Sequence, residues 1–244
     1  MFISIITPTF NSEKNLKNCL ISVQNQNFEN YEHIIIDNCS NDKTIQIINN
    51  FNNSKLRLIS EADNGIYEAM NKGISNSFGE YLLFLNSDDQ LIDEFFLSNV
   101  NKILSKNNNI DILYSNIIYK KNFLGLSRKY IVGDIININN IGNHIPHPGT
   151  LIKKKYLSDI NYFDLSYKIS ADFDFFIKAK KNKKTNYHYY NKFTVLMSPG
   201  GASSGFQNIL KANIECFKSL KKNGIKFPLI FIVLKLLRKF FQLL

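Results

Sequence analysis

The sequence predicts an α/β protein with a mostly parallel, doubly wound sheet, helices on both faces of that sheet and further helices at the C-terminus. Strand-like and helix-like segments alternate through the first half, which is typical of a parallel sheet. Continuous apolar runs at Ile34–Ile36 and Leu82–Leu85 suit strands that are covered on both faces. With 244 residues and 44% hydrophobic content, the chain fits one large domain, or one domain with an appendage.

The first half alternates regularly between the two kinds of segment. Asn11 or Ser12 can cap the first helix, whose apolar residues recur at helical spacing. The third helix ends near Gly79, and Asp88 and Asp89 are candidate caps for the fourth. The expected strands are 2–10, 31–40, 56–61 and 80–86, and the expected helices are 11–26, 41–51, 66–77 and 90–104.

The second half is less regular and richer in turns. One helix begins with two carboxylates, Asp172 and Asp174. A later helix is amphipathic, and its one side carries Phe206, Ile209, Leu210, Asn213, Ile214 and Phe217. The expected elements are two strands of a hairpin at 110–120 and 123–133, a strand and a short helix within 143–157, a helix at 169–182, a strand within 186–204 that ends in a Gly/Ser-rich loop, and a helix at 206–220.

The last segment, 227–244, predicts an apolar helix with one polar stripe. Pro228 suits a first helical position. The helix would be about 25 Å long at roughly 1.5 Å per residue, short of a bilayer core of about 30 Å. We therefore expect it to lie on the anionic cytoplasmic face of a membrane, or to pack on the domain or on a second subunit in a homodimer. The stripe consists of Lys235, Arg238, Lys239 and Gln242.

Charge is divided unevenly along the chain. The net charge is +10, but residues 1–100 hold 6 Lys/Arg and 13 Asp/Glu, whereas residues 101–244 hold 24 and 7. The basic half favours an anionic partner: nucleic acid, an anionic membrane or a phosphorylated substrate. Acidic residues in the first half argue against nucleic acid. Scattered cysteines and an N-terminus without the apolar region of a secretory signal favour the cytoplasm.

Polar residues gather where the four N-terminal strands end. Ligands bind beyond the carboxyl ends of parallel strands, so these four clusters are expected to share one edge. A capping role explains each cluster singly, whereas a metal or nucleotide site explains all of them together. The clusters are Pro8–Asn11, Asp37–Asp42, Glu61–Gly65 and Asn86–Asp89.

Five segments, taken in order, resemble the inverting nucleotide-sugar glycosyltransferases of family 2, which have a GT-A fold with a Rossmann-like sheet. They are SIITPTFN, IIIDNCSNDKT, SEADNGIYEAMNKGI, GEYLLFLNSDD and SADFDFFIK. The resemblance covers residues 3 to about 90, then 146–151 and 170–205. It implies a GT-A domain at 1–205, with a nucleotide-binding half at 1–95 and an acceptor-side half at 96–205. The C-terminal amphipathic helices then occupy 206–244.

The resemblance also implies roles for the acidic residues. Asp88, with Asp89 beside it, would hold the Mn²⁺ or Mg²⁺ that neutralises a leaving diphosphate, and Asn86 and Ser87 would lie against the donor. Asp172 would be the base that accepts the proton of the acceptor hydroxyl, with Asp174 as the alternative. Asn86 stands where the family often has Asp, so the metal site depends mainly on Asp88.

The remaining implied residues surround the donor and the reaction centre. The nucleotide would contact Thr7, Pro8, Asn11, Glu13, Asp37 and Asp63, with Asn71 and Lys72 near the diphosphate or sugar. His147 would lie near the acceptor or the diphosphate, and Ser203 belongs to a Gly/Ser-rich loop, 199–204, that could close over the donor. The family often has Gly where Cys39 stands, so the contact made by Asp37 with the base stays open.

The expected activity is metal-dependent, inverting transfer of a sugar, most simply from a UDP-sugar, to a hydroxyl of a lipid-linked oligosaccharide in surface-polysaccharide biosynthesis, such as O-antigen or capsule. The enzyme would then be cytoplasmic and peripheral on the inner face of the cytoplasmic membrane. Two alternatives are a nucleotidyltransferase and a basic nucleic-acid-binding protein. The first lacks support because the chain has no G-x-x-x-x-G-K loop.

Overall fold

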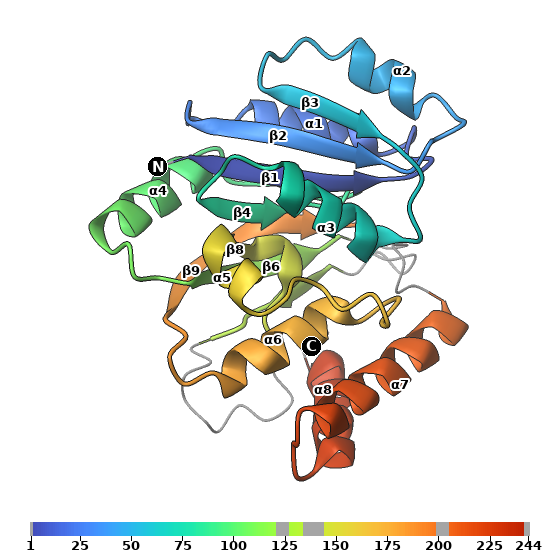
Figure 1. The fold of residues 1–244 in the computed structure, drawn as a ribbon, viewed down its shortest axis with the longest axis vertical. Coiled ribbons are helices and arrows are strands. Elements are labelled where there is room, and N and C mark those ends of the chain that lie inside the picture. The colour runs from blue at the N-terminus through green and yellow to red at the C-terminus, as the bar shows by residue number, and fades with distance from the viewer. Residues whose placement is uncertain (1, 121–126, 134–143, 199–204, 242–244) are drawn as a thin grey trace.

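A nine-stranded sheet forms the centre of the molecule (Figure 1). The computed structural model describes residues 2–120, 127–133, 144–198 and 205–241. The strands follow one another in the order β3-β2-β1-β4-β8-β6-β9-β5, with β7 paired to β6. They are β1 Ile3–Thr9, β2 Tyr31–Asp37, β3 Leu56–Ser60, β4 Tyr81–Phe84, β5 Gln90–Leu91, β6 Ile112–Tyr119, β7 Arg128–Tyr130, β8 Thr150–Lys153 and β9 Tyr187–Met197.

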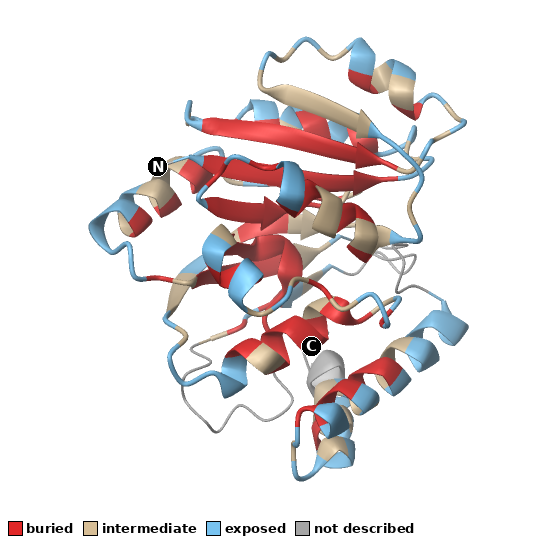
Figure 2. Ribbon diagram, viewed as in Figure 1, coloured by how far each residue is buried: buried red, intermediate tan, exposed pale blue. Residues whose placement is uncertain are grey.

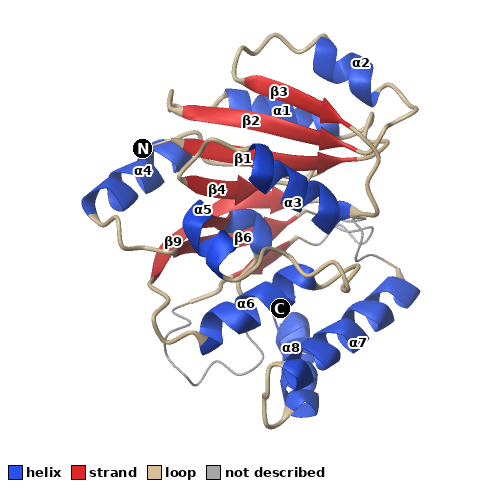
Figure 3. Ribbon diagram, viewed as in Figure 1, coloured by secondary structure: helices blue, strands red, loops and turns tan. Residues whose placement is uncertain are grey.

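Helices cover both faces of this sheet, as the sequence predicts (Figure 3). Along β2, Ile34 and Ile36 join the main core, whereas Ile35 packs with Leu16 and Leu20 in a second core on the other side. The helices are α1 Leu16–Gln24, α2 Thr44–Asn49, α3 Ile66–Asn76, α4 Phe96–Lys106, α5 Lys154–Asp159, α6 Ala171–Lys181, α7 Phe206–Lys222 and α8 Pro228–Phe241, with a 3-10 turn, η1, at His147–Gly149.

The strand order places a natural binding position at one edge of the sheet. β1, β2, β3 and β4 are all parallel, and the chain runs outward from β1 to β3 before it returns to form β4 on the other side of β1. Such a reversal opens a crevice at the carboxyl ends of the two central strands. β8 pairs antiparallel with both β4 and β6, and β9 pairs parallel with β6.

Two predicted helix starts are wrong, for related reasons. A helix was expected at 90–104, but Gln90 and Leu91 form β5 and pair with the distant β9, and α4 begins only at Phe96. Asp88 and Asp89 therefore cap no helix. Similarly, α1 begins at Leu16, four residues beyond Ser12. In both places the chain first builds a loop at the carboxyl end of a strand.

The C-terminal helices pack on α6 rather than on the sheet (Figure 1). A small core joins the three: Phe173 and Ile177 of α6, Cys216 and Leu220 of α7, and Phe231 of α8. Within the residues that the structure describes, no helix is long and apolar enough to cross a membrane.

Candidate functional site

A cleft of about 700 Å³ opens at the carboxyl ends of β1 and β4. Its walls come from the loops after β1, β2, β3 and β4, so the shared edge expected from the sequence is present. Asn208 of α7 also reaches this cleft, from the other end of the chain. The predicted site residues that line it are Pro8, Asn11, Glu13, Asp63, Asn86, Ser87 and Asp88.

The first wall is made by the loops after β1 and β2, which hold each other through hydrogen bonds. Asn11 has a φ of +46° and accepts the backbone N–H of Asn41 at 3.0 Å through its side-chain oxygen. Glu13 accepts the backbone N–H of Lys43 at 3.0 Å. Cys39 has a φ of +50°, so it occupies the left-handed position that Gly would take without strain.

Asp37 and Thr7 lie beneath this wall rather than in it. Asp37 is fully buried, and its carboxylate accepts hydrogen bonds from the Ser40 backbone N–H at 2.9 Å, from the Ser40 hydroxyl and from the Ser60 hydroxyl at 2.8 Å. The Thr7 hydroxyl lies 2.9 Å from Nε2 of His33, a ring kept neutral because burial lowers its pKa to about 3. Asp37 therefore shapes the loop, and it could reach a base only if Ser40 moved away.

Asp63 presents an unsatisfied oxygen in the second wall. Its backbone N–H donates to Asn38 at 2.7 Å, and its Oδ1 accepts the N–H of Gly65 at 2.8 Å. Its Oδ2 is buried and has no hydrogen-bond partner among the described residues. Burial raises the pKa of this carboxyl group. A ribose hydroxyl or a base N–H would supply the missing donor.

The two carboxylates in the segment after β4, Asp88 and Asp89, have different surroundings. Asp89 is buried, and it accepts the Ser198 N–H and the Asn86 side-chain N–H, both at 3.1 Å. Burial, and then the charge of Asp88, raise the pKa of Asp89 to about 8. Asp88 lines the cleft, has no partner from another described residue, and has a pKa raised by burial.

These groups fit a hard divalent cation that a diphosphate helps to hold. Mg²⁺ and Mn²⁺ need few protein ligands when phosphates and waters supply the rest. The Asn86 amide nitrogen faces Asp89, so its oxygen points away and joins Asp88 as a candidate ligand. Asp89 is placed to orient Asn86. Among the described residues, no three or more His, Cys, Asp or Glu side chains are placed together so that they could hold a metal ion, so these residues alone form no complete metal cage.

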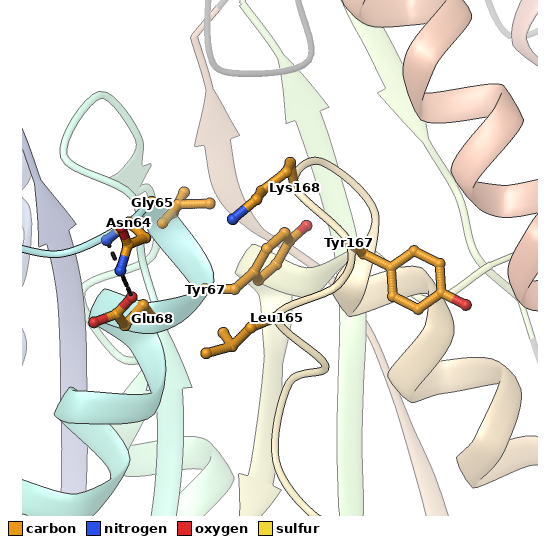
Figure 4. A pocket seen from close by; sticks show the side chains of 8 residues that line it. Asn64, Gly65, Tyr67, Glu68, Leu165, Tyr167 and Lys168 are labelled. Carbon is orange, nitrogen blue, oxygen red and sulfur yellow. Dashed lines mark hydrogen bonds between the residues drawn. The ribbon is translucent and has the colours of Figure 1, made fainter.

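A second pocket, of about 220 Å³, adjoins the cleft across Gly65 and Ile66, which line both (Figure 4). Asp172, in the first turn of α6, lies behind its wall and accepts a hydrogen bond of 2.8 Å from the Tyr67 hydroxyl. The same hydroxyl is 2.7 Å from the carbonyl of Ile169. The pocket is lined by Asn64, Gly65, Ile66, Tyr67, Glu68, Leu165, Tyr167 and Lys168.

Asp174, the alternative base, faces elsewhere. It is buried, accepts hydrogen bonds from Ser219 at 2.7 Å and Asn223 at 3.1 Å, and pairs with Lys178 at 2.7 Å. This carboxylate therefore attaches α7 to α6, and Asp172 is the residue left beside the pocket.

His147 lies in an aromatic cluster behind the site. Its ring stacks on Phe163 and contacts Phe84 edge-on, with ring centroids 5.3 and 4.9 Å away. Burial lowers its pKa, an effect that the nearby charge of Asp172 opposes. Its Nε2 is buried without a hydrogen-bond partner among the described residues.

Asn71 and Lys72 lie on α3 but line neither pocket. The Asn71 amide forms two hydrogen bonds with the Phe163 backbone, at 2.9 and 3.1 Å. The Lys72 ammonium lies 3.1 Å from Glu61 and donates to the carbonyl of Ala62 at 2.7 Å. Both side chains therefore brace loops around the site. Ser203 lies outside the described residues.

Tyr67, like Asn208, is a residue of the site that the sequence interpretation missed. It occupies a buried position of α3 and packs against Phe163, 5.7 Å away between ring centroids. In the sequence it therefore counts as one more apolar residue at helical spacing. Its link to Asp172 spans 105 residues and depends on the packing of α3 against the segment before α6.

Known proteins resemble this chain in sequence and in fold. A "PGL/p-HBAD biosynthesis glycosyltransferase" of Mycobacterium bovis is 29% identical over 184 residues, which is 73% of this chain and 70% of that protein. The structure of S. aureus TarS 1–349 in complex with UDP-GlcNAc matches with a TM-score of 0.72 at 20% identity, over 98% of this chain and 73% of that one. The mannosyltransferase PcManGT of Pyrobaculum calidifontis, in complex with GDP-Man and Mn²⁺, matches with a TM-score of 0.64 at 14% identity, over 97% and 74%.

The family model called "Glycosyl transferase family 2" matches residues 4–169, well over half of the chain. The matched region contains the whole cleft except for Asn208, and it ends just before α6, which carries Asp172. The curled sheet with its covering helices is the GT-A fold of the structural neighbours. The chain therefore belongs to glycosyl transferase family 2.

Proposed function

We propose that this glycosyltransferase moves a sugar from a UDP-sugar to an acceptor hydroxyl, with inversion and with the help of Mn²⁺ or Mg²⁺. The observation that carries the proposal is the pair of neighbouring pockets. One is lined by Asp63, with its partnerless Oδ2, and by the Asp88 carboxylate, and the other is lined by Tyr67, which binds Asp172. The complexes of TarS with UDP and with UDP-GlcNAc, and of PcManGT with GDP-Man and Mn²⁺, support the choice of donor and metal.

The donor side would work through charge and hydrogen bonding. Asp63 would accept a hydrogen bond from the nucleoside, and Asp88 with the Asn86 oxygen would hold the cation against the diphosphate. When bound, such a cation neutralises the charge that develops on the leaving group. Asp89 keeps Asn86 in place through the hydrogen bond of 3.1 Å.

The acceptor side would work through proton transfer. The acceptor hydroxyl gives its proton to Asp172 while its oxygen forms a bond to the anomeric carbon, and the bond to the diphosphate breaks on the opposite face. Tyr67 fixes the carboxylate for this step. Tyr67, which binds this base, also lines the pocket of about 220 Å³, so an acceptor would approach Asp172 from there.

The acceptor that we propose is a lipid-linked oligosaccharide on the cytoplasmic face of a membrane, as in the biosynthesis of surface polysaccharides. The name of the mycobacterial relative, a glycosyltransferase of PGL/p-HBAD biosynthesis, does not identify that acceptor. Support comes from the excess of basic residues in the second half of the chain, which suits the phosphates of such an acceptor.

The two carboxylates can be separated by experiment. Asp88→Asn should abolish the Mn²⁺-dependent thermal shift caused by UDP and reduce kcat/KM severely. Asp172→Asn should keep that thermal shift but lower kcat by about 10²- to 10⁴-fold, because it removes only the base. Asn86→Asp should retain activity, and Asp159→Asn, at an exposed position on α5, is the control for loss of a carboxylate.

Two outcomes would contradict the proposal. One is full metal-dependent activity in Asp88→Asn. The other is the absence of any thermal shift when the intact protein is mixed with nucleotide sugars and Mn²⁺, since a ligand that binds the folded state must stabilise it.

A further inference from the structure

Helix α7 exposes most of its apolar stripe, and its buried side mixes the polar Glu215 and Ser219 with Cys216 and Leu220 (Figure 2). Phe206 is 83% exposed and Leu210 is 54% exposed, and Ile209 and Ile214 are exposed as well. These four residues belong to the apolar stripe that the sequence shows, and such a stripe on a globular protein normally faces the core. Here the described protein leaves it uncovered.

The inward side of α7 adds buried polar contacts to the small apolar core around Cys216 and Leu220. Ser219 and Asn223 donate hydrogen bonds to the buried Asp174, and the Glu215 carboxylate accepts the backbone N–H groups of residues 168–170 at 2.9–3.0 Å. These bonds fix the rotation of the helix about its axis. The outward position of the apolar stripe is therefore a property of the fold and not of a loosely attached helix.

Helix α8 continues the same surface. The Lys235 ammonium points inward, 5.1 Å from the Phe173 ring centroid and 3.2 Å from the Cys216 sulfur. The apolar side of α8 consequently faces outward. Of the 18 large hydrophobic side chains that are exposed in the described part of the chain, ten lie on this hairpin, which we call the α7–α8 face: Phe206, Ile209, Leu210, Ile214, Phe227, Leu229, Ile230, Val233, Leu236 and Leu237.

The charges around the α7–α8 face are mostly positive, with Asp164 as an acid paired to Lys222 at 2.8 Å. Residues 206–244 contain eight Lys or Arg and one acid, Glu215. Glu215 is buried in its bonds to the backbone, so it does not offset the cations outside. The exposed lysines that flank the apolar side chains are Lys211, Lys218, Lys221, Lys222 and Lys226.

We propose that the α7–α8 face docks on the surface of an anionic phospholipid bilayer, with its apolar side chains among the acyl chains and its lysines at the headgroups. An apolar patch edged mainly by cations complements such a surface. A second copy of the same face would bring like charges together. The 14 described residues of α8 rise only about 21 Å, less than the thickness of a bilayer core of about 30 Å.

Docking would also place the donor cleft at the membrane. Asn208 lies on the first turns of α7 and lines that cleft, while Phe206 and Leu210 on the same turns belong to the α7–α8 face. A membrane-anchored acceptor could then reach the site without leaving the lipid. This last step rests on the proposed function, whereas the docking itself does not.

Flotation of the full chain with vesicles tests the docking. We expect binding to vesicles rich in phosphatidylglycerol, weak binding to pure phosphatidylcholine, and a decrease as salt screens the lysines. Phe206→Ser combined with Ile230→Ser should weaken binding on the order of ten- to a hundred-fold, because two apolar side chains no longer enter the bilayer. The matched control is Phe78→Ser with Ile92→Ser, two exposed apolar residues of the first half that are 75% and 43% exposed.

The outcomes separate the proposal from its rivals. Absence of vesicle binding, or equal loss in both double variants, would overturn it. Sedimentation velocity without lipid could instead show a dimer that the Phe206→Ser and Ile230→Ser changes convert to a monomer. That result would assign the face to a second copy of the chain and would also overturn the proposal. The UDP-dependent thermal shift should be unchanged in both double variants, so a failure of the donor chemistry would be recognised independently.

Discussion

Helices α3 and α7 are both amphipathic, but they use their apolar sides in opposite ways. α3 buries Tyr67, Met70 and Ile74 against the sheet, whereas α7 exposes Ile209, Leu210 and Ile214. Periodicity in a sequence therefore identifies an apolar side without saying what covers it. The difference lies in the polar residues on the opposite side. Those of α3 are exposed or half-buried, whereas α7 carries Glu215, Ser219 and Asn223 into buried hydrogen bonds.

The largest effect is expected from replacing one isoleucine of each helix by alanine, in two separate variants. Ile74→Ala should lower the free energy of unfolding by about 2–5 kcal/mol, because Ile74 is fully buried and its truncation leaves a cavity. Ile214→Ala should change it by no more than about 0.5 kcal/mol, because 47% of that residue is already exposed. Urea denaturation of both variants measures the difference. Equal losses would mean that α7 packs its apolar side against protein.

The first half of the fold was predictable because its signals are local. Each parallel strand there is a short apolar run that ends in turn residues, and the runs around Ile34–Ile36 and Leu82–Leu85 correspond to β2 and β4. Strand β5 was not predictable, because two residues become a strand only by pairing with Val195 and Leu196. The predicted hairpin is confirmed where it is described, as β6 paired antiparallel with β7.

In the site, too, some features were predictable from the sequence and others were not. Pro8, Asn11, Asp63 and Asp88 come together in one cleft because parallel strands end at one edge, which the sequence pattern shows. How deeply each side chain is buried depends on the tertiary packing around it. Asp37 also stands at the end of a parallel strand on this edge, but hydrogen bonds from Ser40 and Ser60 hold its carboxylate beneath the cleft. The sequence locates the edge, whereas the tertiary contacts decide which carboxylates remain free.

A smaller test concerns what holds α7 in its orientation. Ser219→Ala removes a hydrogen bond of 2.7 Å to the buried Asp174 carboxylate and should cost about 1.5–3 kcal/mol. Its counterpart in α3 is Ser75→Ala, which removes an exposed bond of 3.1 Å to the Asn71 carbonyl and should be nearly neutral. Hydrogen exchange should show faster opening of α7 in the first variant only. If α7 kept its protection, the apolar contacts of Cys216 and Leu220 alone would account for its orientation.

The smallest effect is expected at the ion pair between Lys222, in the last turn of α7, and Asp164, at 2.8 Å. Burial alone would raise the pKa of Asp164, but hydrogen bonds from Lys222 and Ser166 outweigh it and hold the pKa well below its usual value. Because the folded-state pKa is depressed, the pair stabilises the protein above about pH 4 and loses its contribution as the pH falls further.

Asp164→Asn should therefore lower the free energy of unfolding at neutral pH by about 0.2–1 kcal/mol, since solvent screens this partly exposed pair. The difference from the unmodified protein should shrink on acidification, as measured by urea denaturation at several pH values. The corresponding pair of α3, Glu68 with Lys72 at 3.8 Å, lies within one helix and does not connect two segments. A pH-independent difference would show that the charge of Asp164 contributes nothing, and that the buried contacts of α7 hold the helix without help from this surface ion pair.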